Sequence, residues 1–217
     1  MEITYLGHSS FKIKTKTATV ITDPFDPKMV GLKYSGVEGE IVTVSHDHAD
    51  HNDVDKVTGV KKVVNGPGEY EISGVSIMGY RTSHDDKDGA ERGENTVYVI
   101  EAEGLRVVHL GDIGHVLSDE LLEEIGDIDV LMIPVGGFFT IDPKVAIEII
   151  TKAEPHFVLP MHYNTEGLLG EFAEKLLPLE NFLKESSLPV ENLPKFTLKK
   201  EDILEDQNTK VIVLERK

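Results

Sequence analysis

The pattern of apolar and polar positions along the first half of the chain predicts a series of β-strands. Short runs rich in Val, Ile and other β-branched residues recur there, and Gly, Asp or Pro bounds most of them. Runs of this length and composition are typical of strands rather than helices. The expected strands span residues 3–6, 11–14, 18–21, 41–44, 62–64, 75–79, 97–102 and 106–110.

The pattern changes after residue 112, where helices begin to alternate with strands. Ser118 precedes an acidic first turn, which is typical of the start of a helix. Asp142 and Pro143 form a second start of this kind, and the apolar positions that follow have helical spacing. Further strands are expected at residues 130–135, 157–161 and 211–214, and a further helix at residues 178–188.

Strands in two batches with helices attached predict a layered α/β fold that contains two sheets. No Gly- or Ser-rich linker and no low-complexity tract interrupts the sequence, so we expect residues 1–217 to form a single domain. With 40% hydrophobic residues, a chain of 217 residues can bury a substantial core.

Composition argues against several classes of function. The formal net charge of −17 disfavours a nucleic-acid-binding protein, because such binding relies on Lys and Arg to neutralise phosphates. The sequence shows no apolar stretch long enough for a membrane span and no secretory leader, so we expect a cytoplasmic protein. Because the chain has no cysteine, imidazole and carboxylate groups must hold any metal, and these suit zinc, iron or manganese.

Residues 46–51, with the sequence His-Asp-His-Ala-Asp-His, form a dense group of potential metal ligands. They directly follow an expected strand, so the side chains of His46 and His48 can point to the same side. The turn that follows can direct Asp50 and His51 towards a second position close by. One short segment can therefore supply ligands to two neighbouring metal ions.

Three more potential ligands lie where an expected strand ends and a loop begins. They are His84, Asp112 and His162. Loops at strand ends commonly carry the chemistry of layered α/β folds, because the sheets hold these loops rigidly. The repetition favours a single site that is assembled from several strand ends.

The order of these residues, His-x-His-x-Asp-His, then a His, an Asp and a last His, resembles the metallo-β-lactamase fold superfamily. The resemblance is strongest to a small bacterial and archaeal branch of hydrolases, which is similar to the ascorbate-phosphate lactonase. It covers roughly the first three quarters of the chain, and little is recognised beyond Glu166. The motifs that carry it are Gly7-His8-Ser9-Ser10, Thr22-Asp23-Pro24, residues 46–51, Gly111-Asp112, residues 136–140 and residues 160–165.

This resemblance implies a four-layer αββα sandwich, in which helices cover the outer faces of two mixed sheets. It also implies a site for two metal ions. One ion would be held by His46, His48 and His84. The other would be held by Asp50, His51 and His162. Asp112 would bridge the two ions, since two neighbouring cations repel each other and need an anion between them. Asp50 and Asp112 are the carboxylates expected to take part in catalysis.

Two of these ligands have a simpler alternative interpretation. His84 lies in a very polar loop, where a solvated surface histidine is common. Asp112 follows Gly111, and an Asp in that position is ordinary turn chemistry. His109, in contrast, lies within an apolar run and is expected to be a core histidine rather than a ligand.

Four further residues are candidates for supporting roles or substrate contacts. The resemblance places the turn of His8 near the metals, and a polar turn residue is the alternative. Asp23 can accept a hydrogen bond from a ligand imidazole, because a metal-bound His usually donates its other N–H to such a partner. Turn chemistry before Pro24 is the alternative for Asp23. Tyr163 and Asn164 flank His162 and can polarise a substrate oxygen, or they are surface polar residues.

Phe138 and Phe139 follow two glycines and are adjacent in the sequence, so periodicity does not place both on one core face. Either one of them lines the substrate mouth or a subunit contact, or both are buried in a loop.

The sequence thus predicts a metal-dependent hydrolase with two divalent metal ions, of which zinc is favoured over iron or manganese. The expected nucleophile is a hydroxide bound by the two ions, and the expected substrate is an ester, lactone or phosphodiester of a small metabolite. The prediction includes no nucleic-acid partner and no membrane span, and it leaves a homo-oligomer open.

Two alternative functions are retained. One is a regulator that binds a metal or a ligand without turnover. The other is a nuclease of the same superfamily, which the acidic charge disfavours. Only about fifty residues separate Asp112 from His162, too few for the large inserted domain of the nuclease branch.

Overall fold

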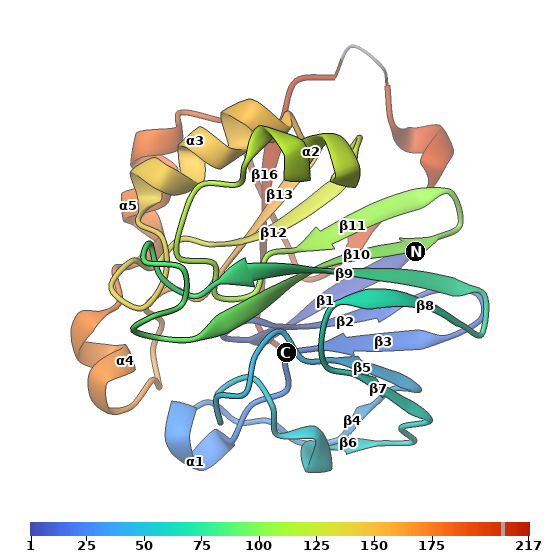
Figure 1. Ribbon diagram of the computed structural model, residues 1–217, viewed down its shortest axis with the longest axis horizontal. Helices are drawn as coiled ribbons and strands as arrows, with labels where there is room; N and C mark the ends of the chain where they lie inside the picture. The colour runs from blue at the N-terminus through green and yellow to red at the C-terminus, as the bar shows by residue number, and fades with distance from the viewer. Residues whose placement is uncertain (205–206) are drawn as a thin grey trace.

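The computed structural model describes residues 1–204 and 207–217. Two β-sheets pack against each other, and helices lie on their outer sides (Figure 1). Both sheets contain parallel and antiparallel pairs of strands. This mixed, layered α/β arrangement confirms the fold class expected from the sequence.

The first sheet has six strands in the order β15-β1-β2-β3-β5-β7. The pairs β15-β1, β1-β2 and β2-β3 are antiparallel, and the pairs β3-β5 and β5-β7 are parallel. The strands span Glu2–Gly7 (β1), Ser10–Lys14 (β2), Thr19–Thr22 (β3), Ile41–Thr43 (β5), Lys62–Val64 (β7) and Phe196–Thr197 (β15).

The second sheet has eight strands in the order β14-β16-β13-β12-β11-β10-β9-β8. Strands β14 to β11 in this order are parallel, and β11 to β8 are antiparallel. The strands span Gly68–Ile72 (β8), Val75–Ser83 (β9), Glu94–Ala102 (β10), Leu105–His109 (β11), Val130–Pro134 (β12), Phe157–Met161 (β13), Val190–Leu193 (β14) and Lys210–Leu214 (β16).

The helices cover the two sheets unequally. Three helices lie over the outer face of the eight-stranded sheet: α2 (Asp119–Ile125), α3 (Pro143–Ala153) and α5 (Leu179–Ser186) (Figure 1). The six-stranded sheet has a thinner outer layer, formed by α1 (Pro27–Val30), the 3-10 helix η1 (Val54–Lys56) and the short strands β4 (Val37–Glu38) and β6 (Val57–Thr58). The described residues also form α4 (Gly170–Lys175) and the 3-10 helix η2 (Lys200–Asp202).

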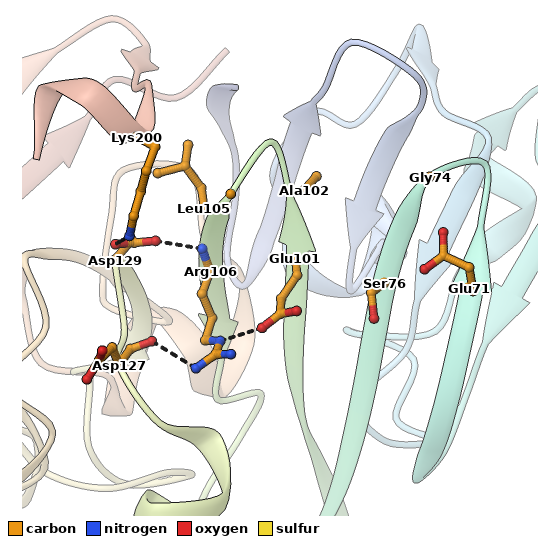
Figure 2. A pocket seen from close by; sticks show the side chains of 11 residues that line it. Glu71, Gly74, Ser76, Glu101, Ala102, Leu105, Arg106, Asp127, Asp129 and Lys200 are labelled. Atoms are coloured by element: carbon orange, nitrogen blue, oxygen red, sulfur yellow. Dashed lines mark hydrogen bonds and ion pairs between the residues drawn. The ribbon is translucent and has the colours of Figure 1, made fainter.

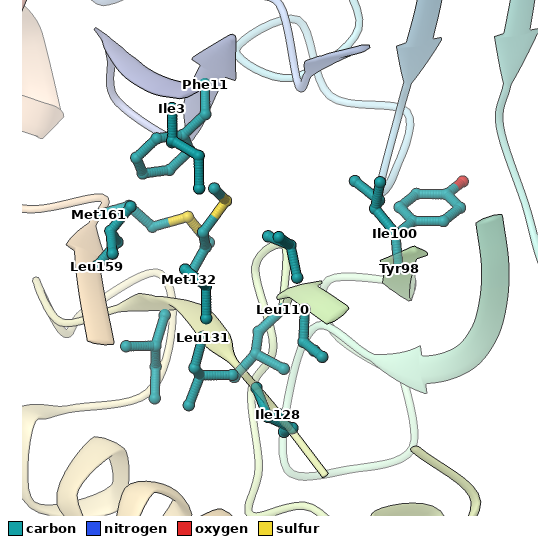
Figure 3. Packing of buried hydrophobic residues seen from close by; sticks show 14 of the residues in the cluster. Ile3, Phe11, Tyr98, Ile100, Leu110, Ile128, Leu131, Met132, Leu159 and Met161 are labelled. Carbon is teal, nitrogen blue, oxygen red and sulfur yellow. The ribbon is translucent and has the colours of Figure 1, made fainter. Parts of the chain in front are cut away.

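The main hydrophobic core lies between the two sheets. Ile3 and Phe11 from the six-stranded sheet belong to the same buried cluster as Met132 and Met161 from the eight-stranded sheet (Figure 3). Burial of one such side chain contributes roughly 1.5–3 kcal/mol to folding, so this layer makes the sheets a firm base for the loops at their edges. Among the described residues, no helix is long and apolar enough to cross a membrane.

Candidate metal centre

Six polar site candidates lie within three residues of the ends of strands that run in the same direction within their sheets. Strands β1 and β3 are both antiparallel to β2, and β5 is parallel to β3. In the other sheet, β9 and β11 are both antiparallel to β10, and β12 and β13 continue in parallel with β11. The loops at the carboxyl ends of these strands therefore share one edge of each sheet. They carry His8, Asp23, His46, His84, Asp112 and His162.

His46, His48 and His84 form a first group, in which one ring nitrogen of each lies within 4.8 Å of the others. The ring centroid of His46 lies 4.5 Å from that of His48 and 4.7 Å from that of His84. His48 is exposed and His46 is buried. His84 has an exposed fraction of 2%, so it is not a solvated surface histidine.

Asp50, His51 and His162 form a second group, and His8 lies with them. Nε2 of His8 lies 3.0 Å from Oδ2 of Asp50, and the ring centroids of His8 and His162 are 4.2 Å apart. All four side chains are buried. His8, which the sequence suggested only for a supporting role, therefore belongs to the set of atoms that could surround a cation.

Asp112 lies between the two groups. Its Oδ2 atom is 3.2 Å from Nε2 of His51 and 3.2 Å from Nε2 of His162. The same oxygen is 3.6 Å from Nε2 of His84, which belongs to the first group. One buried carboxylate thus approaches members of both groups.

Asp23 is buried behind the site and fixes the orientation of two imidazoles. Since a carboxylate only accepts hydrogen bonds, His51 donates from Nδ1 to Oδ2 of Asp23 at 2.9 Å. Ser45 donates from its backbone N–H and its hydroxyl to the same carboxylate, at 2.8 and 2.6 Å. His46 then donates from Nδ1 to the hydroxyl of Ser45, at 2.9 Å. Nε2 of both His46 and His51 is therefore left facing the site.

Asn95, on β10, holds the turn that carries Asp112. Its Oδ1 atom accepts from the backbone N–H of Asp112 at 3.0 Å, and its Nδ2 atom donates to the carbonyl of Leu110 at 2.9 Å. Asn95 was not predicted as a site residue from the sequence, because it lies inside a strand and outside every ligand motif. The available signal is an amide side chain just before the apolar run of residues 97–100.

Gly111 is required by the same turn. Its φ is +56°, and a Cβ atom there would lie 2.6 Å from Cβ of Ser45. A residue with a side chain would displace Ser45 and, through it, the hydrogen bonds to Asp23 and His46.

Three site candidates adopt a left-handed backbone although they are not glycines. The φ angles are 54° for His8, 38° for Asp23 and 53° for His162. Such a conformation costs about 1–3 kcal/mol per residue and persists only where the surroundings enforce it. Here the backbone N–H of His162 donates to the carbonyl of His8 at 2.9 Å, which joins the two sheets at the site.

The electrostatics of the second group favour a positive charge. Burial alone would lower the pKa of His51, but the carboxylates of Asp112 and Asp50 raise it well above its ordinary value. Burial likewise opposes ionisation of Asp112, yet the nearby His162 and His51 hold the pKa of that carboxyl well below its usual range. Either a proton or a metal cation can supply the positive charge that these carboxylates attract.

The donor atoms fit a metal ion. Nε2 of His46, His51 and His162 and Oδ1 of Asp112 are buried and make no hydrogen bond within residues 1–204 and 207–217. A buried polar atom without a partner costs about 1–3 kcal/mol, and coordination of a cation removes that cost. Imidazole nitrogens and carboxylate oxygens are ligands that zinc, iron and manganese accept. This His and Asp cluster can therefore bind metal.

Tyr163 and Asn164 pack next to the site. Tyr163 has an exposed fraction of 9% and stacks on Tyr5, with ring centroids 6.2 Å apart. Asn164 donates from Nδ2 to the carbonyls of Ala173 and Leu176, at 2.8 and 3.2 Å. These contacts anchor the segment around α4, and a role of either residue in polarising a substrate oxygen stays a prediction.

Phe138 and Phe139 take different environments. Phe138 is 53% exposed, whereas Phe139 is half-buried, with its ring centroid 6.4 Å from that of His162 and 5.5 Å from that of Phe172. Phe139 thus packs against the second ligand group and Phe138 faces solvent.

A separate pocket of about 430 Å³ lies at the other end of β11 and contains none of the site candidates (Figure 2). Four of its six charged residues pair with one another. Arg106 donates from Nε to Glu101 at 2.5 Å and from its backbone N–H to Asp129 at 2.7 Å. Lys200 donates to the other oxygen of Asp129 at 2.9 Å. We interpret this network as an anchor for the segment around η2.

Comparison with known proteins agrees with this site. Residues 2–162 match a family model described as a beta-lactamase superfamily domain. The chain belongs to this superfamily. The matched range contains every residue of the two ligand groups and Asp112, and it ends at His162. The resemblance inferred from the motifs is thereby confirmed at the level of the superfamily, and the similarity to the lactonase stays a prediction.

Relatives within the superfamily carry names that describe hydrolases. A metal-dependent hydrolase of Thermococcus onnurineus is 32% identical over 192 residues, which cover 76% of this chain and 85% of the relative. Another, from Thermococcus kodakarensis, is 30% identical over 194 residues, with the same shares of both chains.

Two solved structures share the fold. A protein of Thermotoga maritima, assigned to the Zn-dependent hydrolases of the metallo-beta-lactamase superfamily, is 36% identical with a TM-score of 0.76, and the match covers 99% of both chains. Igni18, a metallo hydrolase of Ignicoccus hospitalis, is 20% identical with a TM-score of 0.67, over 86% of this chain and 90% of its own. The second likeness shows the fold alone.

Proposed function

We propose that this protein is a metal-dependent hydrolase that holds two divalent metal ions and cleaves an ester, lactone or phosphodiester of a small molecule. The observation that carries the proposal is the position of Asp112, whose Oδ2 atom lies within 3.6 Å of imidazole nitrogens from both ligand groups. Such a carboxylate can serve two cations at once and reduce their repulsion. The hydrolase names of the relatives support the reaction class.

The two ligand groups divide the proposed binding roles. His46, His48 and His84 would hold one ion. Asp50, His51 and His162 would hold the other, and Asp112 would contribute to both. Bound there, divalent cations would supply Lewis acidity, which acidifies water and polarises a carbonyl or phosphoryl oxygen of the substrate.

Asp23 and His8 would keep the ligands in place. Asp23 accepts the Nδ1 proton of His51, so Nε2 of His51 is unprotonated whenever the ring is neutral and can coordinate a cation. Burial lowers the pKa of His8 to about 4, so His8 is neutral near pH 7. It can then donate one hydrogen bond from Nε2 to Oδ2 of Asp50 and hold that carboxylate towards the site.

The proposal is tested by hydrolysis assays on protein stripped with a chelator and reloaded with zinc, iron or manganese. A panel of activated acyl esters, lactones and phosphodiesters covers the proposed substrate classes. Removal of metal should abolish hydrolysis and reloading should restore it. Asp112→Asn should lower kcat/KM by at least about 100-fold, since even the loss of a group that only orients a ligand costs about 10- to 100-fold.

Asp55→Asn is the matched control, because Asp55 is exposed on η1 and belongs to neither ligand group. Its kcat/KM should equal that of the wild type. Saturable binding of substrates without turnover by the reloaded wild type would point to a regulator instead. Hydrolysis that survives both the chelator and Asp112→Asn would also contradict the proposal.

A further inference from the structure

A pocket of about 510 Å³ opens beside the first ligand group, with His84 in its wall. Its lining comes from the loop between β9 and β10, from the segment after Asp112, and from the segment between β12 and α3. The pocket is large enough for a part of a substrate that extends away from the bond being cleaved. The side chains that line it can therefore select among substrates.

Arg92 is the notable charge in this pocket. Two other arginines of this chain, which has a formal charge of −17, pair with carboxylates: Arg81 with Glu94 and Arg106 with Glu101. Within the part of the chain that the structure describes, no carboxylate lies within 4.0 Å of the Arg92 side chain. Its guanidinium keeps donors available for an anion from outside the protein.

The acidic residues of the same pocket are mostly engaged elsewhere. The carboxylate of Asp85 accepts four backbone N–H groups, at 2.7–2.9 Å. Asp142 caps α3 by accepting from two backbone N–H groups. Glu91 pairs with Lys87, and Asp86 is exposed to water. These carboxylates therefore compete weakly for the guanidinium of Arg92.

The protein fixes Arg92 in place before any ligand arrives. The backbone N–H of Arg92 is one of the four donors to Asp85, at 2.7 Å. Nη2 of Arg92 donates to the carbonyl of Phe138 at 3.1 Å. The backbone N–H of His84 donates to the carbonyl of Gly93 at 3.0 Å, which ties the Arg92 loop to the strand end that carries a ligand candidate. A cation held in this way loses little freedom on binding.

Two aromatic rings place Arg92 relative to the metal centre. Its Cζ atom lies 5.4 Å from the ring centroid of Phe139 and 5.9 Å from that of Phe138. Phe139 in turn packs against His162. Phe139 thus lies next to both Arg92 and His162 of the second ligand group. An anion on Arg92 is a different group from the one that the metals would hold.

Phe138 adds an apolar surface next to this cation. It is 53% exposed, and Nζ of Lys175 lies 4.3 Å from its ring centroid on α4. An exposed aromatic ring beside the Arg92 guanidinium suits a ligand that combines an anionic group with an apolar portion, whereas Lys175 already pairs with Glu171.

We propose that Arg92, with Phe138 and Phe139, binds an anionic group of the substrate that is remote from the bond being cleaved. The substrates are then esters, lactones or phosphodiesters that carry a second phosphate, phosphonate or carboxylate beside an apolar portion. This inference rests on the proposed hydrolase function. Arg92 would set the specificity for the substrate and would take no part in bond cleavage.

The test compares three 4-nitrophenyl esters of similar length on the metal-loaded protein: the neutral butyrate, the succinate with a terminal carboxylate, and the 3-phosphonopropionate. The wild type should prefer the two anionic esters. Arg92→Gln should lower kcat/KM for them by about 10- to 100-fold, the usual range for a hydrogen bond to a charged group. The loss should appear mainly in KM, because the contact persists from substrate to transition state.

The neutral butyrate should change less than about twofold in Arg92→Gln, and Arg92→Lys should restore part of the preference. Arg81→Gln is the matched control, since it removes an exposed arginine on β9 outside the pocket and should change no ester. An equal loss for all three esters, or no loss for the anionic pair, would overturn the inference. If the wild type prefers only one of the two anionic esters, and Arg92→Gln removes that preference, the inference holds for that class of anion alone.

Failure of the proposed function would look different. If the loaded wild type cleaves none of the esters, calorimetry still compares the binding of butyrate, succinate and 3-phosphonopropionate to wild type and Arg92→Gln. The anion site is supported without any turnover if the wild type binds succinate and 3-phosphonopropionate more tightly than butyrate and Arg92→Gln abolishes this difference. Equal affinities in the two proteins overturn it.

Discussion

At the scale of single residues, the histidines differ in whether both ring nitrogens have partners. His115 uses Nδ1 towards the carbonyl of Val116 and accepts from the backbone N–H of Ser83 at Nε2. His109 donates from Nε2 to the carbonyl of Ser9, at 2.8 Å, and accepts from Gly111 at Nδ1. The site histidines His46 and His51 keep a buried Nε2 without a hydrogen bond inside the described ranges. This contrast separates histidines that can coordinate from those that hold the backbone.

The core role of His109 gives a pH-dependent stability. Burial lowers the pKa of His109 below its ordinary value of 6.5. Below about pH 6.5 the unfolded chain therefore binds a proton that the folded protein excludes. The contribution of the neutral His109 to the free energy of unfolding is thus complete above that pH and is lost as the pH falls. His109→Gln should cost more unfolding free energy at pH 7.5 than at pH 5.5, measured by urea unfolding. Equal costs at both pH values would contradict this role.

Some residue roles could be predicted from the sequence, whereas those that depend on contacts between distant loops could not. His109 was identifiable as a core residue because it lies in an apolar run, and the ligand candidates were identifiable because they follow strands. The contact of His8 with Asp50 joins residues 42 positions apart, and the contact of Arg92 with Phe138 joins residues 46 apart. Such contacts depend on how two loops meet, which periodicity does not encode.

At the scale of elements, the strands that carry the site were the predictable ones. β3, β5, β11 and β13 are almost wholly buried and appear as apolar runs. β8 and β14 were missed, since most of their residues are exposed or half-buried and give no apolar pattern. The short α1 and α4 were missed because four and six residues are too few to show a helical period.

The start of α3 provides a test of the element boundaries. Oδ1 of Asp142 accepts from the backbone N–H groups of Lys144 and Val145, at 2.9 and 3.0 Å. Asp142→Ala should therefore lower the unfolding free energy by about 1 kcal/mol. Thr151→Ala, exposed on the same helix, should change it by less than about 0.5 kcal/mol, again measured by urea unfolding. Equal effects of the two substitutions would show that the cap contributes nothing.

At the scale of the whole molecule, two sheets meet along the edge where six loops converge. The six-stranded sheet supplies His8, Asp23 and the segment 46–51, and the eight-stranded sheet supplies His84, Asp112 and His162. Neither sheet alone holds a complete ligand group together with Asp112. The backbone hydrogen bond from His162 to His8 spans the two sheets, so the site is complete only where the sheets pack together.

The architecture was predictable because the order of the potential ligands along the chain resembles that of a known superfamily. The thinner outer layer on the six-stranded sheet was not, since α1, η1, β4 and β6 are too short to leave a pattern in the sequence. The pocket around Arg92 was also hidden, because its walls come from three loops that are distant along the chain.

The central claim is that this single edge holds two metal ions, and elemental analysis of the protein reloaded after chelation tests it most directly. The account predicts about two divalent ions per chain for the wild type. His84→Ala and His162→Ala should each lower this to about one ion, because each removes a ligand from a different group. A wild type that never exceeds one ion per chain, or single variants that retain both ions, would contradict the account.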